Sequence, residues 1–206
     1  MTETNGTRSD AAGSPPSTPA GESTPPGYFR AGPVLMLAIA AAIIALDQIT
    51  KVLAVVNLEG QQPVRLIGET VRLVLLRNPG AAFSLGTGST VVLSVISTVV
   101  VAGLLWFSRR VHSRWWAWGL GLILGGAAGN LVDRYFRAPG ILEGHVVDFV
   151  SVGWWPVFNL ADSSLVAGVI VIAVTVVRNI DYDGSRMASG RTARDAPADG
   201  RRRRRR

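Results

Sequence analysis

The stretch that decides the fold is WWAWGLGLILGGAAGNLVDR, residues 115–134. Its first eighteen residues carry no charge, and it ends on Asp133 and Arg134. A helix needs about 20 mainly apolar residues to cross a bilayer. The stretch therefore predicts a membrane-spanning helix over about residues 115–133, with Asp133 at its end.

Three further apolar runs have the same character. The first contains Asp47 and Lys51 but is long enough as a whole, and the last reaches a full span only if Asp162 is accepted inside it. We therefore predict an α-helical integral membrane protein with four transmembrane helices. The three further helices are expected over about residues 33–56, 90–107 and 157–177.

The composition supports lipid as the solvent of most of the chain. Of its 206 residues 48% are hydrophobic and 17% are charged, against about 25% charged in an ordinary soluble domain. The sequence pI near 11.1 is typical of nucleic-acid binding. However, residues 178–206 hold ten arginines and four aspartates, so this tail supplies +6 of the net charge of +7. We therefore predict no nucleic-acid partner.

Tryptophan and arginine positions predict the orientation of the helices. All six tryptophans fall at ends of predicted helices, where an aromatic belt forms at the membrane interface. Three arginines crowd the short loop 108–114, and such loops favour the cytoplasmic side. Both termini are then cytoplasmic, and the loops at 57–90 and 134–155 lie outside.

The two ends of the chain differ from the membrane domain, residues 33–178. Residues 1–32 are rich in Pro, Ser, Thr and Gly, which predicts a disordered cytoplasmic extension; a late, cleaved signal peptide is the alternative. Residues 179–206 predict a disordered basic cytoplasmic tail. That tail either binds anionic lipid of the inner leaflet or serves as a solvated topology signal.

The first outer loop has the features of a small sheet. The run VRLVLL at 71–76 is typical of a strand, and it is followed by the turn-prone Asn78-Pro79-Gly80 and by GTG at 86–88. We expect a small β-rich region outside the cytoplasm.

Four carboxylates are expected at the outer end of the bundle: Asp47, Asp133 and Asp162 in the spans, and Asp148 in an apolar stretch. A charge in hydrocarbon costs about 2.5 to 3.5 kcal/mol and marks a functional site by default. Two close carboxylates share a proton, so that one can activate water while the other protonates a leaving amine. The residues alone leave open whether Asp133 or Asp148 is the partner of Asp162.

The local settings of two of these carboxylates repeat. Asn130 with Asp133, and Asn159 with Asp162, share an N-x-x-D spacing that places amide and carboxylate on one helix face. An amide can orient a carboxylate for catalysis. The alternative is that the aspartates only cap helices or form ion pairs, Asp133 with Arg134 and Asp47 with Lys51.

Other functional classes also remain open at this point. A proton-coupled transporter or a tetraspan scaffold would explain buried acids, but not the duplicated motif beside an elaborated outer loop. His145 lies near Asp148 in sequence, yet a lone histidine is more often structural. The absence of cysteine excludes disulfides and thiolate chemistry, and we predict no metal or cofactor.

Taken together, the motifs resemble one known family, lipoprotein signal peptidase, the type II signal peptidase of bacteria. The resemblance covers about residues 47–177 and combines short motifs in order along a four-helix topology. These motifs are DQITK at 47–51, RNPGAAFS at 77–84, GNLVDR at 129–134, VVDF at 146–149 and FNLADS at 158–163.

The resemblance implies an intramembrane aspartic endopeptidase of the bacterial cell membrane, with its active site near the outer leaflet surface. It would cleave prolipoproteins before their diacylglyceryl-modified cysteine, with lipidated precursors and membrane lipids as partners. By position, Asp148 and Asp162 would be the catalytic dyad. The supporting or substrate-binding residues would be Asp47, Lys51, Asn78, Gly80, Asn130, Asp133, Arg134 and Asn159.

Overall fold

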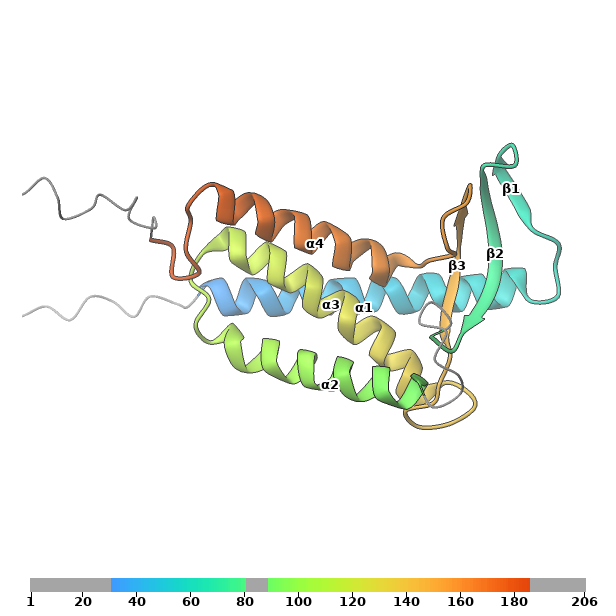
Figure 1. The fold of residues 1–206 in the computed structure, drawn as a ribbon, viewed down its shortest axis with the longest axis horizontal. Coiled ribbons are helices and arrows are strands. Elements are labelled where there is room, and N and C mark those ends of the chain that lie inside the picture. The colour runs from blue at the N-terminus through green and yellow to red at the C-terminus, as the bar shows by residue number, and fades with distance from the viewer. Residues whose placement is uncertain (1–30, 81–88, 186–206) are drawn as a thin grey trace, which may run out of the picture.

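The computed structural model describes residues 31–80 and 89–185. This part of the chain forms a bundle of four helices with a small sheet at one end, and the start of α1 and the end of α4 lie at the opposite end (Figure 1). In chain order the elements are α1 (Ala31–Leu58), β1 (Val64–Ile67), β2 (Val71–Asn78), α2 (Ser89–Ser108), α3 (Arg114–Phe136), β3 (Val146–Val152) and α4 (Leu160–Val177).

Helix α3 packs against all three other helices. Its glycines explain how they approach so closely: a Cβ on Gly125 would lie 3.1 Å from the carbonyl oxygen of Ala40 in α1, and one on Gly126 would collide with the carbonyl oxygen of Ala161 in α4. Small residues of this kind let helix backbones meet inside a membrane. The stretch at residues 115–134 thus forms the centre of the bundle.

Three helices are long and apolar enough to cross a membrane: α1, α2 over Thr90–Ser108, and α4. Their exposed faces are apolar, as expected for surfaces that meet lipid. Helix α3 is long enough, at about 1.5 Å per residue, but glycines and polar residues replace much of its apolar surface. Examples of the exposed apolar side chains on α2 are Val92, Val95, Ile96 and Val99.

The three strands form one antiparallel sheet in the order β1-β2-β3. The strand predicted at 71–76 lies within β2, whereas β3 was not predicted. Strand β3 comes from the second outer loop and pairs with β2 so that Leu76 lies opposite Asp148. The sheet therefore joins two loops that are far apart in sequence, and it places Asp148 above the end of the bundle.

Residues after α4 close the opposite end of the bundle. The carbonyl oxygen of Tyr182 accepts hydrogen bonds from the backbone N–H groups of His112 (2.8 Å) and Ser113 (2.9 Å), and its ring packs edge-on against Phe107 and Trp116. Packing against the bundle thus extends beyond residue 178, as far as Tyr182. The rest of the predicted tail, the predicted extension up to residue 30 and the GTG at 86–88 lie outside the described residues.

Candidate active site

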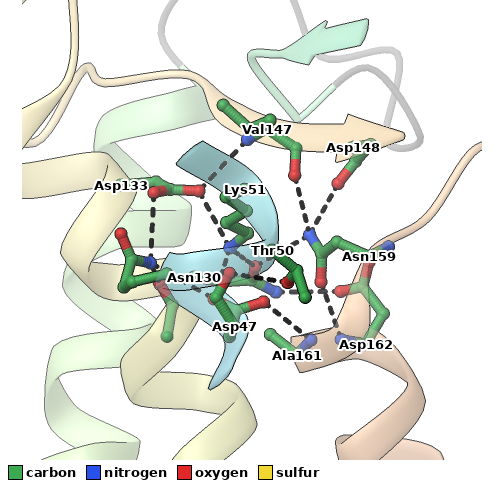
Figure 2. Close-up of polar contacts among 12 residues, drawn as sticks. Asp47, Thr50, Lys51, Asn130, Asp133, Val147, Asp148, Asn159, Ala161 and Asp162 are labelled. Carbon is green, nitrogen blue, oxygen red and sulfur yellow. Dashed lines mark hydrogen bonds and ion pairs between the residues drawn. The ribbon is translucent and has the colours of Figure 1, made fainter. Parts of the chain in front are cut away.

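Polar side chains gather where the helix bundle meets the sheet, and they come from four different elements (Figure 2). Helix α1 contributes Asp47 and Lys51, α3 contributes Asn130 and Asp133, and β3 contributes Asp148. The first turn of α4 contributes Asp162, and Asn159 is its N-cap residue. These groups are largely shielded, and the side chains of Asp47, Lys51, Asp133 and Asn159 are 0% exposed. Buried polar groups of this kind need hydrogen-bond partners.

The second N-x-x-D motif fixes the start of α4. The side-chain oxygen of Asn159 accepts a hydrogen bond from the backbone N–H of Asp162 (2.9 Å), and the Asp162 carboxylate accepts one from the backbone N–H of Asn159 (3.1 Å). This reciprocal capping box satisfies two N–H groups that the helix itself leaves unpaired. The capping interpretation is therefore correct for this motif, but it leaves other donors and acceptors of both side chains free for the site.

The side-chain amide nitrogen of Asn159 forms a hydrogen bond with a residue of β3. It donates to Asp148 Oδ1 at 2.7 Å, so one asparagine contacts both Asp148 and Asp162 (Figure 2). The other oxygen of Asp148 accepts from Asn78 Nδ2 at 2.8 Å. Asp162 Oδ1 accepts from Asn130 Nδ2, also at 2.8 Å. Neutral amides thus hold these two carboxylates.

Asp148 titrates at an unusual pH for an aspartate. Burial raises its pKa to about 6, and the neighbouring carboxylate of Asp162 acts in the same direction. The hydrogen bonds from Asn78 and Asn159 lower the pKa, because they favour the ionised form, but they do not overcome burial. A carboxyl of this kind can hold or release a proton close to neutral pH.

Asp47 and Asp133 have a different environment, because each contacts a cation. Lys51 Nζ lies 2.8 Å from Asp47 Oδ2 and 2.9 Å from Asp133 Oδ2. The predicted pairing of Asp47 with Lys51 is correct. The alternative pairing of Asp133 with Arg134 is wrong: Asp133 Oδ1 bonds instead to Arg137 Nε at 2.6 Å, because residues four apart share a helix face and neighbours do not.

Asp148 and Asp162 both line one cavity of about 400 Å³. Arg134 also lines it, is 8% exposed, and its Nη1 atom has no hydrogen-bond partner within the described part of the chain. At the rim, the backbone N–H of Gly80 donates to Asn78 Oδ1 at 2.8 Å. The φ of Gly80, +106°, is a conformation that favours glycine. The cavity thus offers two carboxylates and one arginine N–H group to a ligand.

A family model described as "Signal peptidase (SPase) II" matches residues 39–178. The chain belongs to this family. The match covers α1 from residue 39 onward, together with the other three helices and the sheet. It therefore favours the peptidase interpretation over the transporter and the scaffold.

Relatives and solved structures agree with this assignment. The chain is 56% identical to a lipoprotein signal peptidase of Mycobacterium avium (strain 104), over 82% of this chain and 91% of the relative. It is 52% identical to one of Rhodococcus jostii (strain RHA1), over 82% and 85%. A solved bacterial membrane enzyme is similar with a TM-score of 0.62 and 28% identity, over 74% of this chain and 96% of that one. The protein is thus a multi-pass bacterial membrane protein.

All ten residues singled out from the sequence of this signal peptidase lie in or beside the polar site between the helix bundle and the sheet, but two further residues were missed. Gln48 donates to the backbone oxygen of Gly129 (3.0 Å) and to Asp47 and Asp133 (3.2 and 3.3 Å). Arg137 was also missed, although its spacing of four from Asp133 is a readable signal.

The weaker candidates from the sequence receive little support. The backbone N–H of His145 donates to the carbonyl oxygen of Ala138 at 3.0 Å. Within the described residues, no hydrogen bond or ion pair joins its side chain to Asp148. Over residues 31–80 and 89–185, no three or more histidine or acidic side chains form a group that could hold a metal ion.

Proposed function

We propose that Asp148 and Asp162 are the catalytic pair with which this signal peptidase cleaves its substrates. As a member of the family, the protein removes signal peptides from prolipoproteins. The observation that supports the assignment is the shared cavity, which both carboxylates line. Asp133 is a poor partner for Asp162 because it is 0% exposed and engaged by Lys51 and Arg137.

The pair performs general acid–base catalysis on a peptide bond. The ionised carboxylate takes a proton from a water molecule as the water oxygen attacks the carbonyl carbon. The protonated carboxyl donates a hydrogen bond to the carbonyl oxygen, where negative charge develops. As the tetrahedral intermediate collapses, the C–N bond breaks and the leaving nitrogen receives a proton from the pair.

The substrate is a lipidated precursor, cleaved before its diacylglyceryl-modified cysteine. An outward-facing groove of about 400 Å³ begins at Asp162 and supports this assignment, because its wall is mainly apolar. An acyl chain in this groove would keep the scissile bond beside the catalytic pair. The groove is lined on α4 by Val166, Ala167 and Ile170, and before α4 by Trp155 and Phe158.

We place the site near the outer leaflet surface, with four membrane spans, both termini cytoplasmic and no nucleic-acid partner. Three arginines of the α2–α3 connection support this orientation, because they lie at the end of the bundle opposite the sheet. Helix α3 is the fourth span: its glycine-rich surface is covered by the other helices, so it needs less apolar surface toward lipid.

Single substitutions test the catalytic assignment. Asp148→Asn and Asp162→Asn each remove one member of the pair, so we expect cleavage to fall by about 10²–10⁴-fold or more. The assay follows the gel shift of a diacylglyceryl-modified precursor with purified protein in detergent. Asp183→Asn is the control, because Asp183 is exposed at the opposite end of the chain's folded part. Full activity in either dyad variant would rule out the assignment.

Accessibility of introduced cysteines tests the orientation, because the chain has none of its own. Glu69 lies in the sheet region and its side chain is 66% exposed, while Arg110 is exposed in the α2–α3 connection. The thiol reagent is membrane-impermeant and is added to cells whose outer envelope has been permeabilised while the cell membrane stays intact. It should label Glu69→Cys and spare Arg110→Cys. The reverse pattern would invert the proposed topology.

A further inference from the structure

Lys51 is fully buried although it touches neither catalytic carboxylate. Its ammonium group has three N–H donors and no acceptor. All three have a partner: Asp47 Oδ2 at 2.8 Å, Asp133 Oδ2 at 2.9 Å and Asn130 Oδ1 at 2.9 Å. The third contact is the informative one, because Asn130 also bonds to Asp162.

The side-chain amide of Asn130 has a defined orientation. Its oxygen accepts from Lys51 Nζ and from Asn159 Nδ2 (3.1 Å), while its nitrogen donates to Asp162 Oδ1 (2.8 Å). If the amide were turned over, its N–H groups would face the ammonium and its oxygen would face the carboxylate. The cation therefore makes only one of the two orientations favourable.

We infer that Lys51 is a positioning residue: by binding the oxygen of Asn130, it turns the amide N–H of Asn130 toward the carboxylate of Asp162. This inference rests on the proposed role of Asp162. The same Asn130 oxygen contacts the amide nitrogen of Asn159, which donates to Asp148. One buried cation thereby orders the donors to both members of the catalytic pair.

The surrounding charges allow the cation to be buried. Lys51 pairs with the carboxylates of Asp47 and Asp133, and Arg137 pairs with Asp133 as well, so two positive charges neutralise two negative charges. Asp47 Oδ1 also accepts from the backbone N–H of Ala161 at 2.9 Å, which ties α1 to the first turn of α4. Buried ion pairs often stabilise no more than apolar residues of the same size, so stability alone gives a weak reason for a lysine here.

The test must separate loss of orientation from loss of folding. Lys51→Met alone would leave an unbalanced carboxylate, so it is combined with Asp47→Asn, which keeps the charge balanced and retains an oxygen for Ala161. The control is Gln48→Leu, because Gln48 contacts the same two carboxylates but not Asn130. Melting temperature, kcat and KM are measured with the diacylglyceryl-modified precursor.

The double variant is expected to fold and to lose about tenfold or more in kcat, the scale for loss of an orienting partner, with little change in KM. Gln48→Leu should lower the melting temperature while reducing kcat much less. An equal fall in kcat for the control would overturn the inference, because it would show a general effect of the ion cluster. An unchanged kcat in the folded double variant would overturn it as well.

A double-mutant cycle with Asn130→Ala tests the route of the effect. If Lys51 acts through Asn130, then replacing Lys51 causes no further loss of kcat in a protein that already carries Asn130→Ala. Additive losses would contradict this route. Should the charge-balanced variant not fold, Lys51→Arg in the Asn130→Ala background applies the same criterion with the charge retained.

The two proposals fail in different ways. Cleavage by Asp162→Asn at the wild-type rate would remove the proposed catalytic pair. The second case is an inactive Asp162→Asn variant together with additive losses for Lys51 and Asn130. This result would support the catalytic pair and exclude only the proposed role of Lys51.

Discussion

Two pairs of aspartates lie side by side in this protein, and their partners differ. Asp47 and Asp133 bond to cations and are 0% exposed. Asp148 and Asp162 bond to neutral amides and line a cavity. A cation neutralises a carboxylate, whereas an amide orients it without adding charge. The comparison therefore separates carboxylates that pair with cations from carboxylates that, in the proposed function, exchange protons with a substrate.

The largest contrast is expected in stability. Asp133→Asn leaves Lys51 and Arg137 with one anion fewer, and breaking a buried ion pair costs about 3–5 kcal/mol. Asp148→Asn removes a carboxylate whose charged form burial already disfavours, so its free energy of unfolding should change much less. Thermal unfolding of both purified variants in one detergent measures the difference. Equal destabilisation would mean that the two pairs are not distinct.

Asn159 both caps α4 and donates a hydrogen bond to Asp148, so its substitution should affect stability and activity together. Asn159→Ala removes a helix cap, which costs about 1 kcal/mol, and it also removes the donor to Asp148. We expect a modest fall in melting temperature together with a fall in kcat of about tenfold or more. Asn159→Asp serves as the matched variant, because it preserves the cap oxygen but not the amide donor. If it cleaves as fast as the wild type, the amide contact has no catalytic role.

The smallest expected effect is a shift in the titration of Asp148. The hydrogen bond from Asn78 lowers the pKa of Asp148, so Asn78→Ala should raise it above about 6. The charge of Asp162 raises the same pKa, so Asp162→Asn should lower it. Infrared titration of the aspartate carboxyl band, compared with Asp148→Asn to assign the signal, measures both shifts. Shifts of the same sign would contradict this account of the site.

Much of this arrangement could be predicted from the sequence, because the length of an apolar run and the presence of a charge inside it can both be recognised within one segment. The four helices form within a few residues of their predicted bounds, and Asn159 with Asp162 forms the helix cap that was the alternative to a contact between amide and carboxylate. The other repeat differed: Asn130 donates to Asp162 on α4 rather than to Asp133. Spacing within one helix cannot show which of two helices a side chain will serve.

The sequence by itself determined that helices cross a membrane and that buried carboxylates carry the chemistry, because hydrophobic length and the cost of buried charge are properties of each segment. Only the tertiary structure decided which carboxylates belong together. Pairing of β3 with β2 places Asp148 beside Asn78, while α1 brings Lys51 to Asp133. These partners lie far apart along the chain, and a cation or an amide acts only on the carboxylate that the fold brings within hydrogen-bond distance.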